Sequence, residues 1–193
     1  MSEQPQPLDL SAGDEGVEFC RLPLADADAT DFQLLLRWWE RTRGRRAMPS
    51  RAEVDPEHLR PILHRLLIVE VCRNPPDFHY RLAGTQARTI HGIELTGRSV
   101  LGLVPRAQGK LMWNDCCEML RHKQPQHVLL QFTNREGQPR RYRVLRVPLS
   151  HDGTQVDHIM VVQDFGVEPR KLAEMYREFR RAEEAARATA APG

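Results

Sequence analysis

The sequence predicts an α+β fold with five β-strands and a helix flanking each end. Two observations predict it. A pair of β-rich segments near the middle of the chain is separated by a turn sequence, and three more β-rich segments follow a long amphipathic segment, joined only by short turns. A chain of 193 residues is long enough for one domain to bury a core without disulfide or metal support. One α+β domain with extensions is therefore expected.

The beginning of the chain predicts a flexible tail followed by a helix. Residues 1–27 are rich in polar residues, alanine and proline, so little burial offsets the entropy of ordering them. Within residues 28–47, Phe32, Leu35 and Trp39 recur at helical spacing until a glycine supplies a stop. This pattern predicts an N-terminal amphipathic helix with an aromatic face.

Two strands and a series of short turns are expected next. "RLLIVEVC", residues 65–72, is dense in β-branched and aliphatic residues, and "FHYRLA", residues 78–83, alternates apolar and polar side chains, so the two predict a hairpin. Repeated glycines over residues 84–106 predict short helical turns. Gly92 and Gly97 lie five residues apart, not in the tight G-x-G-x-x-G turn of a dinucleotide site, so their interpretation is architectural.

A long helix and a three-stranded meander are predicted for the second half of the chain. "QGKLMWNDCCEMLRHK", residues 108–123, places its apolar side chains on one helical face until a proline forces an end. The segments "QHVLLQFTN", "RRYRVLRVPLS" and "QVDHIMVVQDF" predict three strands joined by short turns. In the middle strand, alternation places Tyr142, Val144 and Arg146 on one face of the sheet.

Charge and composition argue against several kinds of partner. The formal net charge of +2 is too small to indicate a nucleic acid or a membrane surface. No run of eighteen apolar residues is present to span a bilayer, and the acidic N-terminal sequence does not fit a signal peptide. A cytoplasmic protein without membrane insertion is expected. The four cysteines lack the spacing of a zinc site and the density of a disulfide scaffold, so free thiols and no metal site are expected.

Several of these segments together resemble a PAS domain. "FHYRLAGT" is followed by "HGIELTGRSV", the long helix, the meander and a closing "IMVVQDF", and the lead-in "MPSRAEVDPEHLRPIL" resembles a bacterial PAS variant. The resemblance covers residues 48–166, with a C-terminal flanking helix over residues 167–193. It implies a PAS-like five-stranded antiparallel sheet with helices on one face, a small pocket between them, and a sensory or regulatory function.

The residues do not favour the flavin-adduct or haem chemistry of related sensors. Light sensors of this family share a Gly-x-Asn-Cys segment, and Val100 stands here where the reactive cysteine would be, so no adduct is expected, while non-covalent flavin stays open. A haem ligand would come from a histidine on the long helix, and His122 lies at its solvated end. The cofactor is therefore unknown, and none is expected to be tightly bound.

Cys116 is the basis of the alternative function, an enzyme. A reactive thiolate needs a nearby base or cation, and Asp115 and His122 are the candidates close in sequence. On a helix, however, His122 lies nearly two turns beyond Cys116, and Asp115 would raise the pKa of the thiol, so a buried and inert cysteine is expected. An orphan enzyme with a cysteine-containing pocket, or a haem or redox sensor, stays the alternative.

A ligand pocket would lie where alternating strand residues meet one face of the long helix. Arg146, flanked by apolar neighbours on a central strand, would either meet an anionic ligand or form a salt bridge. The candidate pocket wall consists of Tyr80, Leu82, Met112, Cys116, Met119, Leu130, Val144, Arg146 and Val161. Most of these residues are also expected in an ordinary core, so the sequence leaves open whether the pocket is filled by side chains.

The terminal helices predict how the protein would transmit a signal to other proteins. Their apolar side chains are more numerous than one small sheet is expected to cover, so a symmetric homodimer is predicted. The candidate interface residues are Leu35, Trp38, Trp39, Leu172, Met175 and Phe179. The leading hypothesis is a cytosolic regulatory protein, not an enzyme, that binds a small ligand or a partner and signals through its dimer or a separate signalling protein.

Overall fold

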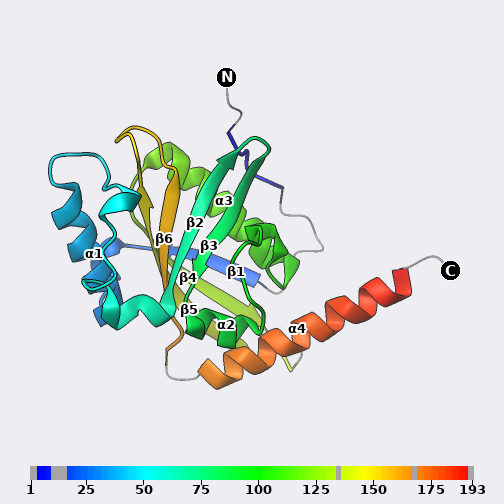
Figure 1. Ribbon diagram of the computed structural model, residues 1–193. Coiled ribbons are helices and arrows are strands. Elements are labelled where there is room, and N and C mark those ends of the chain that lie inside the picture. The colour runs from blue at the N-terminus through cyan, green and yellow to red at the C-terminus, as the bar shows by residue number, and fades with distance from the viewer. Residues whose placement is uncertain (1–3, 10–16, 134–135, 167–168, 191–193) are drawn as a thin grey trace.

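In the computed structural model, which describes residues 4–9, 17–133, 136–166 and 169–190, one antiparallel sheet lies between helices (Figure 1). Its strands are β1 (Val17–Leu22), β2 (Leu66–Arg73), β3 (Pro76–Ala83), β4 (Gln126–Thr133), β5 (Pro139–Leu149) and β6 (His158–Asp164). The helices are α1 (Thr30–Arg43), α2 (Thr85–His91), α3 (Arg106–His122) and α4 (Pro169–Ala190), with 3₁₀ turns at Leu24–Asp26, Arg51–Glu53, Arg60–Arg65 and Val100–Gly102. The α+β class and the five predicted strands are confirmed.

The sheet joins the hairpin to the meander. The strands lie in the order β1-β4-β5-β6-β2-β3, and every neighbouring pair is antiparallel. β2 and β3 form the predicted hairpin, β4, β5 and β6 form the predicted meander, and pairing of β2 with β6 connects the two. β5 therefore lies inside the sheet, and its second half, from Val144 to Leu149, is buried on both faces.

The sheet has six strands, not the five predicted, because β1 forms within the segment expected to be a flexible tail. β1 pairs along β4 with Phe19 opposite Leu130, and its side chains are only partly buried or exposed. A short edge strand of this kind is stabilised mainly by backbone hydrogen bonds to its neighbour, which leave little hydrophobic pattern in the sequence. The remainder of the predicted tail includes residues 1–3 and 10–16, which lie outside the described residues.

The two faces of the sheet are covered by different helices. α3 packs on one face, where its Asp115 meets Arg146 of β5. α1, expected only as a flanking helix, packs on the opposite face, where the Phe32 ring meets His127 of β4 with ring centroids 5.4 Å apart. No helix within the described residues is both long and apolar enough to cross a bilayer.

The aromatic face of α1 is used inside the chain. Leu35, Trp38 and Trp39 are 0%, 4% and 1% exposed, and the indole Nε1 of Trp39 donates a hydrogen bond of 2.7 Å to the carbonyl of Pro148. These side chains do not form the exposed apolar surface on which the predicted homodimer rested. A single chain covers them because α1 lies flat against the sheet, which the helical pattern alone does not reveal.

The glycines between β3 and α3 act as turn residues. Gly92 ends α2 with φ of 65°, and its N–H donates to the carbonyl of Arg88 at 2.8 Å. Gly97 has φ of 81°. Only glycine adopts these left-handed conformations without steric cost, so the architectural interpretation of both residues agrees with their backbone angles.

Candidate functional site

A small cavity lies between the sheet and α3, at the position predicted for the pocket. It has a volume of about 20 Å³. It is lined by Leu67, Tyr80, Leu103, Gln108, Met112, Leu130, Tyr142, Val144, Arg146, Val161 and Gln163. Six of the nine predicted wall residues therefore meet there, whereas Leu82, Cys116 and Met119 do not line it. The half-buried Leu82 belongs to the sheet-edge strand β3, and the other two are buried elsewhere along α3.

The cavity is nearly filled by protein side chains. A volume of about 20 Å³ has room for about one water molecule, whereas sites for drug-sized ligands and cofactors occupy roughly 300–1,000 Å³. Neither a flavin nor a haem fits this wall as it stands. Any larger ligand would have to move side chains that line the cavity.

Arg146 forms an ion pair across the pocket wall, which was one of its two predicted roles. Its Nη1 lies 2.5 Å from Oδ2 of Asp115, and the two side chains are 2% and 4% exposed. Arg21 of β1 reaches the other carboxylate oxygen of Asp115 at 3.1 Å. Burial raises the pKa of Asp115, although both neighbouring guanidinium groups oppose this effect. With its charge already matched, Arg146 is poorly suited to anchor an anionic ligand.

Some polar atoms of the cavity wall lack hydrogen-bond partners. Nε and Nη1 of Arg146 and Oε1 of Gln163 are buried without a partner of acceptable geometry, so the short contact between Arg146 and Asp115 is ionic but poorly directed. Buried polar groups of this kind are costly unless they are satisfied. The wall therefore has unused hydrogen-bonding capacity for a small polar guest.

A hydrogen-bond network connects the cavity to the C-terminal helix. Gln108 of α3 donates from Nε2 to the Tyr142 hydroxyl at 2.8 Å, and the Tyr176 hydroxyl of α4 donates to Oε1 of Gln108 at 3.0 Å. The two tyrosine hydroxyls lie 3.2 Å apart. Burial raises the pKa of Tyr142 to about 12, so both phenols stay protonated and able to donate at neutral pH. Gln108 and Tyr142 line the cavity, and Tyr176 belongs to α4.

Tyr176 anchors α4 on the body of the protein. It is 1% exposed, and its ring centroid lies 4.5 Å from that of His91 on α2 and 5.7 Å from that of Phe132 on β4. Leu172 and Met175 are buried beside it, and Phe179 is partly buried. The residues predicted as a dimer seam thus pack within the chain, because the first half of α4 lies across α2 and the end of the sheet (Figure 1).

The adjacent cysteines Cys116 and Cys117 do not have the raised acidity of reactive thiols. Burial raises the pKa of the Cys116 thiol far above its ordinary value. Burial also raises the pKa of the Cys117 thiol, to about 11. Thiols with raised pKa values are poor nucleophiles, and His122 is exposed at the end of α3. Within the described residues no group of three or more His, Cys, Asp or Glu side chains could hold a metal ion.

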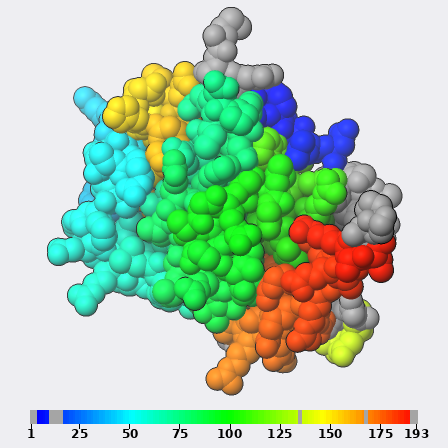
Figure 2. Space-filling model, turned by 45° about the vertical axis from the view of Figure 1, so that its right-hand side comes forward, coloured from blue at the N-terminus to red at the C-terminus, as the bar shows by residue number. Residues whose placement is uncertain are grey.

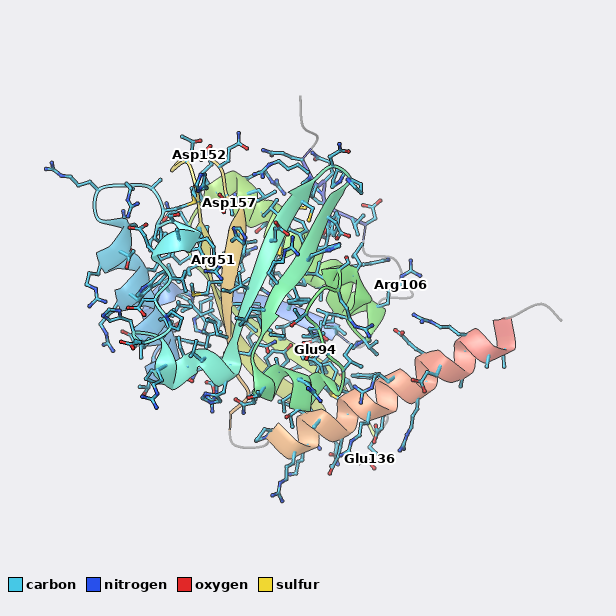
Figure 3. The ribbon with its side chains drawn as sticks, viewed as in Figure 1. Arg51, Glu94, Arg106, Glu136, Asp152 and Asp157 are labelled. Atoms are coloured by element: carbon cyan, nitrogen blue, oxygen red, sulfur yellow. The ribbon has the colours of Figure 1, made fainter. Side chains whose placement is uncertain are left out.

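The acidic side chains Asp152 and Asp157 are structural. Both lie in the turn between β5 and β6, far from Arg106 and Glu94 (Figure 3). Asp152 accepts hydrogen bonds from the backbone N–H groups of Thr154 and Gln155 at 2.8 and 2.9 Å, which lower its pKa. These contacts shape the turn, and Asp157 also pairs with the neighbouring His158 at 2.6 Å.

His91 is a buried histidine at the contact between α2 and α4. It is 3% exposed, and burial, with a smaller effect of Arg180, lowers its pKa to about 4. Its backbone carbonyl accepts a hydrogen bond from Nη1 of Arg180 on α4. The imidazole is therefore neutral at neutral pH and packs as an uncharged ring against Tyr176.

We expect the burial of His91 to make stability depend on pH. Above about pH 6.5 the ring is neutral in both the folded and the unfolded state, and its contribution is fully present. As pH falls from about 6.5 towards 4, only the unfolded state binds the proton, so stability decreases by up to about 3 kcal/mol. Urea unfolding at several pH values in this range should show a smaller loss in His91→Leu than in the wild type. Equal losses in the two proteins would contradict the assignment.

The three residues of this hydrogen-bond network were not among the site residues predicted from the sequence. Tyr142 shares a predicted strand face with Val144 and Arg146, so this alternation was a signal that could have included it. No periodic pattern in the sequence pointed to Gln108 or Tyr176. Their hydrogen bond joins residues 68 positions apart, which no local pattern reveals.

Comparison with known proteins supports the predicted resemblance. The PAS domain family matches residues 28–162 of this chain. Among solved structures, a light-oxygen-voltage domain studied with a flavin analogue is 16% identical, with a TM-score of 0.44 over 67% of this chain and 93% of that one. The LOV protein of Rhodobacter sphaeroides is 15% identical, with a TM-score of 0.42 over 65% and 94%. An RNA-binding light-oxygen-voltage receptor is 15% identical, with a TM-score of 0.40 over 72% and 41%. No curated protein matches the sequence.

Proposed function

Because the chain belongs to the PAS domain family over residues 28–162, we propose that it is a sensory or regulatory protein, not an enzyme, whose output is the position of α4. The single observation that carries the proposal is the network formed by Gln108, Tyr142 and Tyr176. Two members belong to the cavity wall, and the third anchors the helix. A change at the wall would therefore change how firmly α4 is held.

The input is a small polar ligand or a protein contact that rearranges the cavity wall. Two states with different wall arrangements would bind such an input with different affinity, and this difference shifts the population of docked α4. The limited volume of about 20 Å³ supports an input that acts by moving side chains, not one that occupies a preformed pocket. No tightly bound cofactor takes part in this proposal.

The output is read by protein contacts. With Trp38, Trp39 and Met175 buried inside the chain, contacts with a second copy or a separate signalling protein would use the exposed side of α4. A homodimer remains a prediction, and light scattering on the full chain is its test. The proposed location is the cytoplasm, as predicted from the sequence.

We expect Gln108→Leu to loosen α4 without loosening the sheet. The change keeps a side chain of similar size but removes both hydrogen bonds to the tyrosines, each of which contributes about 1 kcal/mol. Hydrogen exchange of amides in the first half of α4 should become about tenfold faster or more, while β4 and β5 amides keep their rates. Gln155→Leu, in an exposed turn, is the matched control. Unchanged exchange in α4 would contradict the proposed coupling.

A further inference from the structure

An extended segment near the chain's own N-terminus, residues 5–9, is bound by side chains of α3 other than Gln108, the α3 residue that contacts Tyr176. Asn114 forms a pair of hydrogen bonds with the backbone of Leu8: its Oδ1 accepts from the Leu8 N–H at 2.7 Å, and its Nδ2 donates to the Leu8 carbonyl at 2.8 Å. The indole Nε1 of Trp113 donates to the carbonyl of Gln6 at 2.6 Å. The Cys117 thiol points to the carbonyl of Pro5 at 3.5 Å, and Lys110 Nζ to that of Asp9 at 3.4 Å.

These four side chains form one continuous stripe on α3. Positions 110, 113, 114 and 117 are spaced as neighbours on one helical face. The hydrogen bonds that these side chains form with residues 5–9 all reach backbone atoms, so the stripe recognises an extended main chain and not a particular set of side chains. A tryptophan N–H that donates to a carbonyl beside a buried proline is a recurring way to bind an extended, proline-containing peptide.

The bound segment is held with little burial. Within residues 4–9 only Pro5 is buried, and the other residues are exposed, so the segment lies on the surface as the dark blue atoms in Figure 2. Hydrogen bonds at an exposed surface contribute little net stability, while ordering an extended segment costs conformational entropy. Another extended segment could therefore replace this one.

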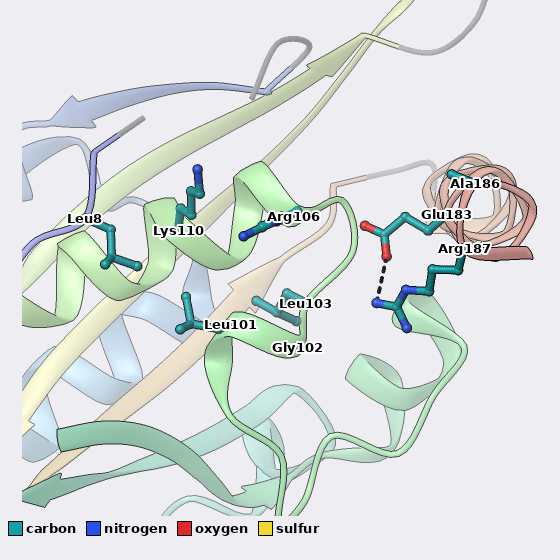
Figure 4. A pocket seen from close by; sticks show the side chains of 9 residues that line it. All are labelled: Leu8, Leu101, Gly102, Leu103, Arg106, Lys110, Glu183, Ala186 and Arg187. Atoms are coloured by element: carbon teal, nitrogen blue, oxygen red, sulfur yellow. Dashed lines mark ion pairs between the residues drawn. The ribbon is translucent and has the colours of Figure 1, made fainter. Parts of the chain in front are cut away.

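An open groove continues the stripe towards the beginning of α3. The segment runs from Pro5 near Cys117 to Asp9 near Lys110, which is the direction of the α3 N-terminus. There a groove of about 580 Å³ separates α3 from the second half of α4, with Leu8, Leu101 and Leu103 among its apolar residues (Figure 4).

Among the described residues that line this groove, cations outnumber carboxylates. Arg106, Lys110 and Arg187 are the cations, and Glu183 lies 3.6 Å from Arg187. Arg106 is the first residue of α3, at the end of that helix nearer to α4 (Figures 3 and 4). In a bound peptide whose leucine takes the place of Leu8, the residues after that leucine would enter the groove. There they would lie close to these cations.

We propose that this face of α3 is a binding site for an extended peptide of a partner protein, of the type Pro-x-Pro-Leu followed by acidic residues, and that residues 4–9 occupy it in the free chain. The stripe binds the backbone of the proline-containing part, and the groove binds the acidic part. The chain's own segment acts as a competitor at an effective concentration of the order of millimolar. This site shares Leu103 with the wall of the cavity but does not include Tyr176.

The test uses a fluorescein-labelled peptide, Gln-Pro-Gln-Pro-Leu-Asp-Glu-Glu, and full-length protein in a fluorescence anisotropy titration. Pro5→Gly/Pro7→Gly keeps the backbone groups of the chain's own segment but removes its preference for the extended form. We expect this variant to bind the peptide about tenfold more tightly than the wild type, because its own segment competes less well. Adding Asn114→Ala should weaken binding about tenfold, while adding the exposed change His122→Ala should leave it unchanged.

Three results would overturn the proposal. The first is no binding to Pro5→Gly/Pro7→Gly at millimolar peptide, and the second is equal binding with and without Asn114→Ala. The third result is a wild-type dimer that the peptide dissociates, since this would show exchange of the segment between copies.

Two controls accompany these titrations. Circular dichroism of each variant confirms folding, and Asn114→Asp, which loses the donor to Leu8, serves as a second variant at the same position. A peptide ending in Lys-Lys should bind more weakly, because the cations of the groove repel it, and equal binding of the two peptides would contradict the role of the groove.

Discussion

Tyr176→Ala is expected to lower the free energy of unfolding by about 3–5 kcal/mol, the usual cost of deleting a large buried aromatic side chain. The truncation removes the ring contacts with His91 and Phe132, which lie on two different elements. It also removes the hydroxyl that donates to Gln108. Urea unfolding followed by far-UV circular dichroism measures the loss.

Tyr176→Phe separates the two contributions. Phenylalanine keeps the ring contacts and removes only the hydroxyl, so the expected loss is about 1–2 kcal/mol. A loss in Tyr176→Ala no larger than in Tyr176→Phe would contradict the role of the ring as the anchor of α4.

Asp115→Ala is expected to be similarly severe, with a loss of about 3–5 kcal/mol. The substitution leaves the guanidinium of Arg146, which is 2% exposed, buried without its counter-charge. Equilibrium unfolding in urea at neutral pH is the measurement. Arg146→Met together with Asp115→Leu should recover most of the loss, because replacing both members of a buried ion pair by apolar residues is often neutral.

Glu118→Ala is the matched control on the same helix. Glu118 also pairs with Arg21, but its side chain is 40% exposed, so its loss should stay within about 1 kcal/mol. If Asp115→Ala costs no more than Glu118→Ala, the buried pair with Arg146 is not a main support of the pocket wall.

The elements with a strong periodic pattern could be predicted from the sequence. α1, the hairpin of β2 and β3, α3 and the meander all have apolar side chains at the spacing their geometry requires. Alternation along β5 also placed Val144 and Arg146 on the cavity face. These predictions succeed because burial of one face imposes a pattern on the residues themselves.

Features that depend on distant partners could not be predicted in this way. β1 is held by the backbone of β4, and backbone groups are the same for every sequence. The side chains of Trp38 and Trp39 indicate an apolar face but not the surface that covers it. The contact of Tyr176 with Gln108 joins polar atoms of two helices, and polar atoms produce no periodic signal.

In the proposed mechanism, α4 undocks as a unit while the sheet stays folded. Native-state hydrogen exchange of the wild-type protein at increasing urea measures this undocking. Amides of Leu172, Met175 and Tyr176 should exchange through an opening of lower free energy than the β4 and β5 amides, which should require global unfolding. Exchange of all these amides with one common free energy, equal to that of global unfolding, would show that α4 opens only when the whole domain unfolds and would contradict its role as the signalling element.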